Sequence, residues 1–240
     1  MRRLQCIPGQ GLTERFFMLP GAYQIAKKDI GLLLFKGRGV VQAALLGLLL
    51  IFLFSLAGSG GTIPESWIAA VFWLASCFSL VLVFNGLYAL EEESNAREGL
   101  LMAPIPAQSI WLGKALAGGL LLLLLQVLFL PAGVVFLGAG PLSSWLQGMG
   151  LLLSVDVGLI LLGSLFGALG QGLSTKESLL SVILFPLQIP LIMAGIHIGE
   201  VLLAAPAEAG DLSSWFGLIL AFDAVFAGAG LILFPFVYAE

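Results

Sequence analysis

Long apolar runs, separated by short polar or glycine-rich connections, make up most of the chain after residue 39. A helix needs about 20 predominantly apolar residues to cross ~30 Å of hydrocarbon. The pattern therefore predicts an all-α membrane protein in one domain, because no connection is long enough to be a linker. The predicted transmembrane spans cover about residues 40–57, 67–90, 110–137, 149–169, 179–203 and 215–238.

The segment YQIAKKDIGLLLFK at residues 23–36 is too short and too charged to span a membrane. Its apolar residues can share one helical face, with Lys27 and Lys28 on the opposite face; Asp29 follows them in the sequence. We expect an amphipathic helix over residues 23–38 that lies on membrane lipid at the interface; a disordered tail is the alternative. The residues on the predicted apolar face are Ile25, Ile30, Leu33 and Leu34.

The remaining boundaries follow from these elements. Residues 1–22 are predicted to be an N-terminal extension, and residues 39–240 the transmembrane domain.

Composition supports a membrane location, since 60% of the residues are hydrophobic and 10% are charged. Soluble domains carry roughly 25% charged residues. Nucleic-acid binding is not expected, because no basic patch is interleaved with aromatic residues.

The ten Lys and Arg residues are distributed very unevenly. Those beyond the N-terminal segment are Arg97, Lys114 and Lys176, and a chain with the predicted spans places all ten on one side. Because basic residues in short loops face the cytoplasm, we expect both termini to be cytoplasmic. The basic residues of the N-terminal segment are Arg2, Arg3, Arg15, Lys27, Lys28, Lys36 and Arg38.

The loop EEESNAREGLLMAPIPAQS at residues 91–109 holds the densest charge cluster after the N-terminus. It can be a solvated helix extension, or it can present a short apolar helix, begun at Gly99 and ended at Pro104, to a partner protein. Exposed apolar residues beside charges are typical of a binding surface. The residues in question are Glu91, Glu92, Glu93, Arg97, Glu98, Gly99, Leu100, Leu101 and Pro104.

Two carboxyl groups, Asp156 and Asp223, fall inside predicted spans, and His197 lies near the outer end of another. At 1.5 Å per residue, both acids sit roughly 10–12 Å from the outer side. Intramembrane ionisable residues often mark functional sites. One hypothesis is a polar site formed by all three residues. The other is that each acid is neutral or hydrogen-bonded between helices and holds the bundle together.

Pro186 and Pro190 stand four residues apart in the predicted span at 179–203. Each removes a backbone donor, so we expect a kink in this helix. The kink can mark a moving element or reflect packing alone.

Catalytic motifs are missing from the sequence. It contains no GxxxxGK[ST] phosphate loop, no HExxH and no GxSxG, and its single histidine cannot form a multi-histidine metal site. We therefore expect a non-enzymatic membrane subunit that binds no cofactor or metal by itself, with any ATP hydrolysed on another chain.

Several segments resemble the CcmB family, haem exporter protein B. They are the loop EEESNAREGLLMAPIPAQSIWLGK, the stretch LLSVILFPLQIPLIMAG at residues 179–195, the ending WFGLILAFDAVFAGAGLILFPFV and the N-terminal KKDIGLLLFKGRG. The resemblance extends over most of the chain from Tyr23 onward.

This resemblance implies a permease subunit of the bacterial inner membrane, similar to type-2 ABC exporters. Such subunits pair with the ATPase CcmA, assemble with CcmC and CcmD, and serve the haem chaperone CcmE in cytochrome c maturation. It further implies that residues around Glu98–Leu101 form a coupling helix, that haem is the possible substrate, and that the chain forms a homodimer. The alternatives are a scaffold that transports nothing and a type-2 permease for a lipid or polysaccharide.

Overall fold

The computed structural model describes residues 10–36, 38–58, 61–93, 102, 105–169, 177–204 and 212–239. In this part of the chain all regular structure is helical, which confirms the predicted fold class. The helices are α1 (Gln10–Lys36), α2 (Arg38–Ala57), α3 (Glu65–Glu93), α5 (Ala107–Leu137), α6 (Trp145–Leu169), α7 (Glu177–Leu203) and α8 (Ser213–Ala239).

The structure has 6 helices that are long and apolar enough to cross a membrane, as the sequence predicted. Helices suit this environment because each satisfies its backbone N–H and C=O groups internally, where lipid offers no partner. The candidate spans are Gly39–Ala57, Glu65–Leu90, Ala107–Leu137, Trp145–Leu169, Phe185–Leu203 and Ser213–Phe236.

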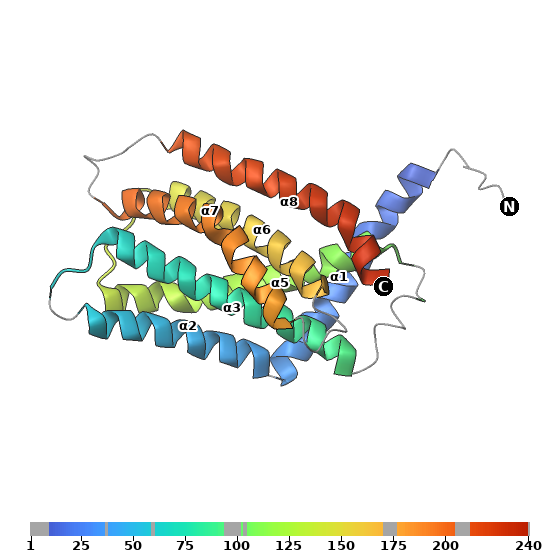
Figure 1. The fold of residues 1–240 in the computed structure, drawn as a ribbon, viewed down its shortest axis with the longest axis horizontal. Helices are drawn as coiled ribbons and strands as arrows, with labels where there is room; N and C mark the ends of the chain where they lie inside the picture. The colour runs from blue at the N-terminus through green and yellow to red at the C-terminus, as the bar shows by residue number, and fades with distance from the viewer. Residues whose placement is uncertain are drawn as a thin grey trace.

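The long helices lie side by side and alternate in direction, with α2 along one edge and α8 along the other (Figure 1). In the most apolar stretch of α3, 61% of the residues are buried, against 17% in α2 and in α8. The protein interior is therefore built around α3, whereas α2 and α8 present most of their side chains outward. Several of these outward side chains are large and apolar, as lipid contact requires.

Small residues allow large rings into this interior. The ring of Phe84 on α3 lies against Gly118 of α5 and Gly163 of α6, so closely that a Cβ atom at either glycine would collide with it. Small residues at helix contacts let neighbouring helices approach closely in a membrane. The two glycines thus bring α5 and α6 together around one α3 side chain.

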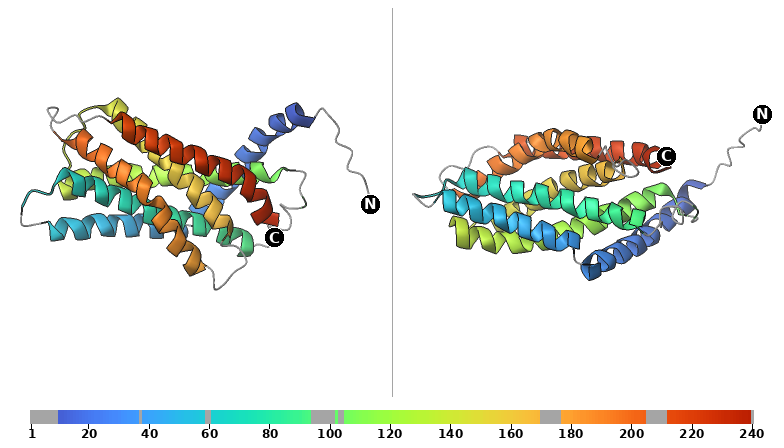
Figure 2. Two further views of the ribbon diagram at one scale, coloured as in Figure 1. Left: turned by 45° about the horizontal axis from the view of Figure 1, so that its top comes forward. Right: turned by 60° about the horizontal axis from the view of Figure 1, so that its bottom comes forward.

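Helix α1 crosses the end of the bundle obliquely, at the end where α3 and α8 finish and α5 begins (Figure 2). We call this end of the molecule the α1 end. The helix ends that flank Arg97 and Lys176 also lie there. The opposite end holds the ends of α2, α5 and α7 and the starts of α3, α6 and α8 (Figure 1).

Helix α1 begins before the amphipathic segment, and the bundle covers part of its apolar face. The helix begins at Gln10 and continues through Pro20, so it includes residues assigned to the N-terminal extension. An amphipathic pattern shows which part of a helix has one apolar face. It does not show where the helix begins, so the helix can start earlier. The buried face is formed by Ala22, Ile25, Ala26, Asp29 and Leu33, whereas Leu34 is exposed.

Helix α7 contains both Pro186 and Pro190 and changes direction along its length (Figure 1). The ring of Trp73 on α3 lies against Gly195 of α7, which leaves no space for a side chain at that position.

Candidate functional site at the α1 end

The predicted partner-binding loop joins α3 to α5 at the α1 end. Glu91, Glu92 and Glu93 form the last residues of α3, and Met102 within the loop is exposed. The other predicted loop residues, Arg97, Glu98, Gly99, Leu100, Leu101 and Pro104, lie outside the described residues. The helices that flank the loop, α3 and α5, are in the part of the chain that the structure describes, and their contacts show how these two helices are held.

A buried ion pair joins α1 to the beginning of α5. Lys114 Nζ lies 3.2 Å from Asp29 Oδ2, and the two side chains are 0% and 5% exposed. The other carboxylate oxygen of Asp29 lies 3.2 Å from Nζ of Lys28, whose side chain is 42% exposed. Lys114 is therefore paired inside the protein, and Lys28 contacts the same carboxylate from the surface side.

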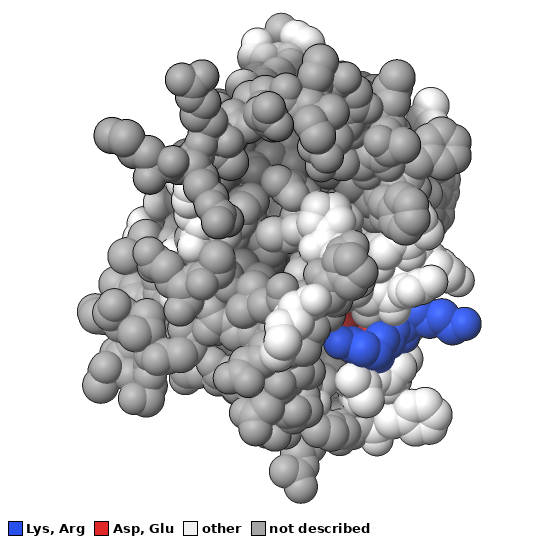
Figure 3. Space-filling view, turned by 90° about the vertical axis from the view of Figure 1, so that its right-hand side faces the viewer, with Lys and Arg blue, Asp and Glu red and all other residues white. Residues whose placement is uncertain are grey.

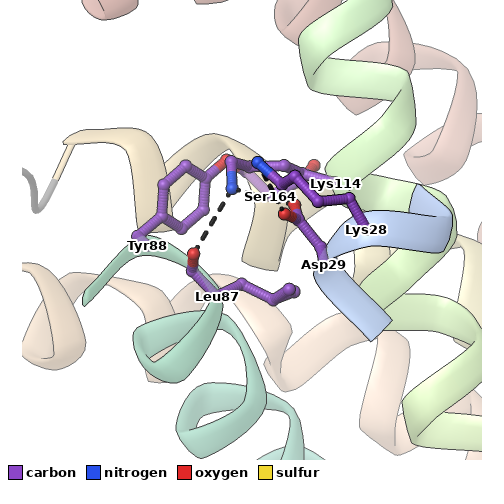
Figure 4. A network of polar contacts seen from close by, with 6 residues as sticks. All are labelled: Lys28, Asp29, Leu87, Tyr88, Lys114 and Ser164. Carbon is purple, nitrogen blue, oxygen red and sulfur yellow. Dashed lines mark hydrogen bonds and ion pairs between the residues drawn. The ribbon is translucent and has the colours of Figure 1, made fainter. Parts of the chain in front are cut away.

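Lys114 also binds α3, next to the start of the loop (Figure 4). Its Nζ donates a hydrogen bond of 3.3 Å to the carbonyl oxygen of Leu87 and lies 4.7 Å from the centre of the Tyr88 ring. Cations are attracted to the face of an aromatic ring. The hydroxyl of Tyr88 donates in turn to the carbonyl oxygen of Ser164 on α6, at 2.7 Å.

We call these five residues, Asp29, Leu87, Tyr88, Lys114 and Ser164, the α1-end cluster. They come from α1, α3, α5 and α6, and thus connect both helices that flank the loop with α1.

Glycines bring the helices of this cluster into contact. A Cβ atom at Gly113 would lie 2.8 Å from Ile25 Cβ and 2.9 Å from the Ala22 carbonyl oxygen, so α1 rests directly on the α5 backbone. Gly167 of α6 likewise faces the ring of Tyr88 without room for a side chain. The ion pair is thus held at a close helix crossing.

Lys27 and Lys28 are both exposed on α1, and their place at a lipid interface stays a prediction. Figure 3 shows basic side chains protruding at the α1 end, with a small acidic area beside them. Asp29, the third residue singled out in this helix, occupies the buried face between Ile25 and Leu33, although the neighbouring Lys28 is exposed.

A second polar cluster lies in the interior of the bundle. Gln126 Nε2 on α5 donates to Asp156 Oδ1 on α6 at 2.7 Å and lies 3.3 Å from Ser76 Oγ on α3. All three side chains are buried. We call them the interior cluster. It joins the same three helices, α3, α5 and α6, further along their length.

The three predicted intramembrane residues have different neighbours. Asp156 faces Gln126, whereas Asp223 of α8 lies against Gly158 on the other side of α6. His197 of α7 lies near the ring of Trp215 on α8, with ring centres 4.8 Å apart. A site shared by all three residues stays a prediction, and the contact of Asp156 is of the interhelical kind that the second hypothesis described.

An apolar cavity of about 150 Å³ opens near the other end of the bundle. Its lining includes Trp73, Phe129 and Trp145, from α3, α5 and α6. Pockets for drug-sized ligands measure roughly 300–1,000 Å³, so this cavity is small for a ligand the size of haem.

Comparison with known proteins agrees with the resemblance noted in the sequence. The sequence model described as "CcmB protein" matches residues 21–240. The chain belongs to the CcmB family. The match leaves out the first 20 residues and includes both polar clusters, from Asp29 to Ser164.

Curated relatives carry the name heme exporter protein B. The Paracoccus denitrificans protein is 30% identical over 204 residues, which is 85% of this chain and 88% of the relative. The Pseudomonas aeruginosa protein is 30% identical over 148 residues, 61% of this chain and 66% of the relative. The Rhodobacter capsulatus protein is 31% identical over 139 residues, covering 58% and 63% of the two chains. No solved structure matches the chain significantly.

Sequence reasoning alone did not find the partners within this CcmB-family chain. Lys114 was interpreted only as a topological charge, and Gln126 and Ser76 were not singled out. A signal existed for each cluster, because a lysine or an amide within an apolar span needs a partner. Asp29 also has the spacing of the buried residues Ile25 and Leu33, which places it on their face.

Proposed function

We propose that this chain is the membrane subunit of an ABC transporter complex that handles haem during cytochrome c maturation. A partner ATPase hydrolyses ATP, and the chain converts that cycle into export of haem or release of the haem-loaded chaperone. The family match over residues 21–240 carries this proposal, and the relatives' name, heme exporter protein B, supplies the cargo. The chain itself is then not an enzyme.

In this proposal the α1 end faces the cytoplasm of a bacterial inner membrane. The distribution of basic residues supports this orientation. Those of the N-terminal segment end at Arg38, the first residue of α2, Lys114 lies near the start of α5, and the helix ends that flank Arg97 and Lys176 lie at the α1 end. The loop between α3 and α5 is then the coupling element that receives the ATPase, around Glu98–Leu101. Two copies of the chain with two ATPase subunits would give a two-fold symmetric complex.

Isolation of the tagged chain from its native membrane tests the partners. We expect an ATPase of the CcmA type to be recovered together with CcmC and CcmD, and CcmE in smaller amount. The variant Leu101→Asp should lose the ATPase, since it places a charge on the proposed docking helix. Leu146→Asp is the matched control, because Leu146 is 84% exposed in the first turn of α6 at the opposite end. Equal recovery of the ATPase with both variants would contradict the proposed docking site.

A non-transporting scaffold is the second candidate. One observation favours it: the buried Asp156 bonds to Gln126 between α6 and α5, as expected of a residue that holds helices together. Proteoliposomes that hold only the chain and its ATPase separate the two functions. Transport requires ATP-dependent haem flux in them. A scaffold gives no flux there, yet supports ATP-dependent release of loaded CcmE in the complete complex.

A further inference from the structure

The α1-end cluster connects three separate parts of the molecule through one ammonium group. Nζ of Lys114 contacts Asp29 on α1 and the Leu87 carbonyl on α3, while its own backbone belongs to α5. The helices α3 and α5 are the two that flank the proposed coupling loop. This side chain is therefore a direct connection between α1 and both helices that flank the loop.

Stability alone does not explain a buried ion pair at this position. Removing two charges from water costs free energy that their attraction often fails to recover, so an apolar pair of similar size would serve as well. The adjoining contact of Ile25 with Gly113 already packs α1 on α5 by apolar surface. Apolar contact is non-directional and does not by itself define how far one helix has shifted along another.

The ion pair adds this missing directionality. Both oxygens of the Asp29 carboxylate are engaged, one by Lys114 and one by Lys28, which fixes the position of the carboxylate between the two. Sliding α1 by one helical turn, about 5.4 Å, would leave two charges buried without each other. A small displacement of α5 is therefore followed by α1 rather than absorbed by slippage between the helices.

We propose that the Asp29–Lys114 ion pair locks α1 to the helices that flank the coupling loop, so that motion at the loop moves α1 as part of the same body. The proposal rests on the proposed function for its effect on haem handling, but the locking itself is a property of the chain. Asp29 and Lys114 are positioning residues, and neither is required to contact haem or ATP.

The first measurement follows locking directly and does not depend on the proposed function. Spin labels are placed at Tyr23 on α1 and Leu116 on α5, both exposed, in the full chain in lipid nanodiscs with Cys6 and Cys77 replaced by alanine. The distance distribution between the labels should be narrow in the parent chain and broad in Asp29→Asn. Asp29→Glu, which keeps the carboxylate, should leave it narrow. An equally narrow distribution in all three proteins would overturn the proposal.

The second measurement follows coupling in the complete complex, as the number of loaded chaperones released per ATP hydrolysed. We expect Asp29→Asn to lower this ratio about tenfold, within the range of 5–150 typical of coupling between sites, while ATP hydrolysis stays within about twofold. Asp29→Glu, which keeps the carboxylate, should keep the ratio close to that of the parent. Glu65→Gln, which removes an exposed carboxylate at the opposite end, is the control that should leave both rates unchanged.

The neutral double variant, Asp29→Asn with Lys114→Gln, serves if the single variant fails to assemble, because it leaves no unpaired buried charge. It should assemble and still show the reduced ratio. A ratio equal to that of the parent in an assembled variant would refute the locking role. If the parent complex shows neither ATP hydrolysis nor release, the proposed function fails while the label distances still decide whether the pair locks α1.

Discussion

The two buried polar clusters join the same three helices but differ in chemistry. The α1-end cluster contains a full ion pair, Asp29 with Lys114, whereas the interior cluster joins a carboxyl group to an amide and a hydroxyl. The first lies near the end of the spans and the second within them. In our proposal, the contacts of the first cluster fix α1, whereas those of the second hold spans together.

The lysine at the α1 end had an alternative to burial. Lysine side chains near the end of a span commonly extend toward water and keep the ammonium solvated. Lys114 is instead 0% exposed and reaches Asp29, which lies on a helix outside the set of spans. We infer from the burial of Lys114 that its contact with Asp29 determines the position of α1.

In the interior cluster no such choice exists, because no water is available at this depth in a bilayer. The amide of Gln126 offers donors to a carboxyl oxygen and to a hydroxyl, so one side chain serves α3 and α6 together. Hydrogen bonds between membrane helices contribute about 0.6 kcal/mol on average, with values near 1.7 at most. The interior cluster should therefore have a smaller effect on stability than the ion pair.

Removing the ammonium should have the largest effect. Lys114→Met leaves the carboxylate of Asp29 buried with only Lys28 at its rim, and breaking a buried pair in this way costs about 3–5 kcal/mol. We expect a clear loss of thermal stability of the purified chain in nanodiscs. Lys28→Gln, which removes the exposed partner of the same carboxylate, is the matched control and should cost about 0–1 kcal/mol. Equal losses for the two variants would mean that burial does not strengthen the pair.

Filling the space beside Tyr88 should have the next largest effect. Gly167→Ala forces the ring away from α6 and disturbs both its hydroxyl bond to Ser164 and its contact with Lys114, and overpacking typically costs about 1–3 kcal/mol. Gly150→Ala on the same helix is the control, since nothing lies within 4 Å of a Cβ atom there. Thermal unfolding of the two variants checks this, and similar stabilities would show that the α1-end cluster tolerates displacement of Tyr88.

A smaller effect is expected in the interior cluster. Gln126→Leu removes the group that binds both Asp156 and Ser76, and we expect a loss of about 1–2 kcal/mol from the two hydrogen bonds. Gln188→Leu offers a matched control, because Gln188 is also buried and has no hydrogen-bond partner among the described residues. In thermal unfolding in nanodiscs, Gln126→Leu should be less stable than Gln188→Leu. The reverse order would show that the interior cluster does not hold the helices together.

The fold was predictable from the sequence because the membrane imposes simple rules on it. Each predicted span, such as 40–57 or 149–169, lies within one observed helix, since only a helix satisfies its own backbone in hydrocarbon. The start of α1 at Gln10 was not predictable from its apolar face. The orientation of the chain rests on Lys and Arg alone and stays a prediction.

The two clusters were beyond sequence reasoning for a different reason. Asp29 and Lys114 are 85 residues apart in the sequence, and their contact depends on how α1 crosses α5 at Gly113. Spacing within one helix tells which residues share a face, but it does not tell which helix that face meets. Gln126 was similarly visible as an isolated amide in a run of leucines, without any sign that Asp156 was its partner.

The smallest stability effect is expected for Asp156→Asn. An asparagine at this position can still accept a hydrogen bond from Gln126 through its carbonyl oxygen, so we expect a change below about 0.5 kcal/mol, as for substitutions that leave the contacts in place. If the carboxyl group only joins α5 to α6, release of loaded chaperone per ATP should also be unchanged. Asp223→Asn provides the comparison, because Asp223 faces the opposite side of α6 at Gly158. The contrary outcome is a severe loss of chaperone release in Asp156→Asn with normal stability and assembly. The carboxyl group would then have a role that an amide of the same shape cannot fill. Such a result would place the interior cluster in the haem pathway.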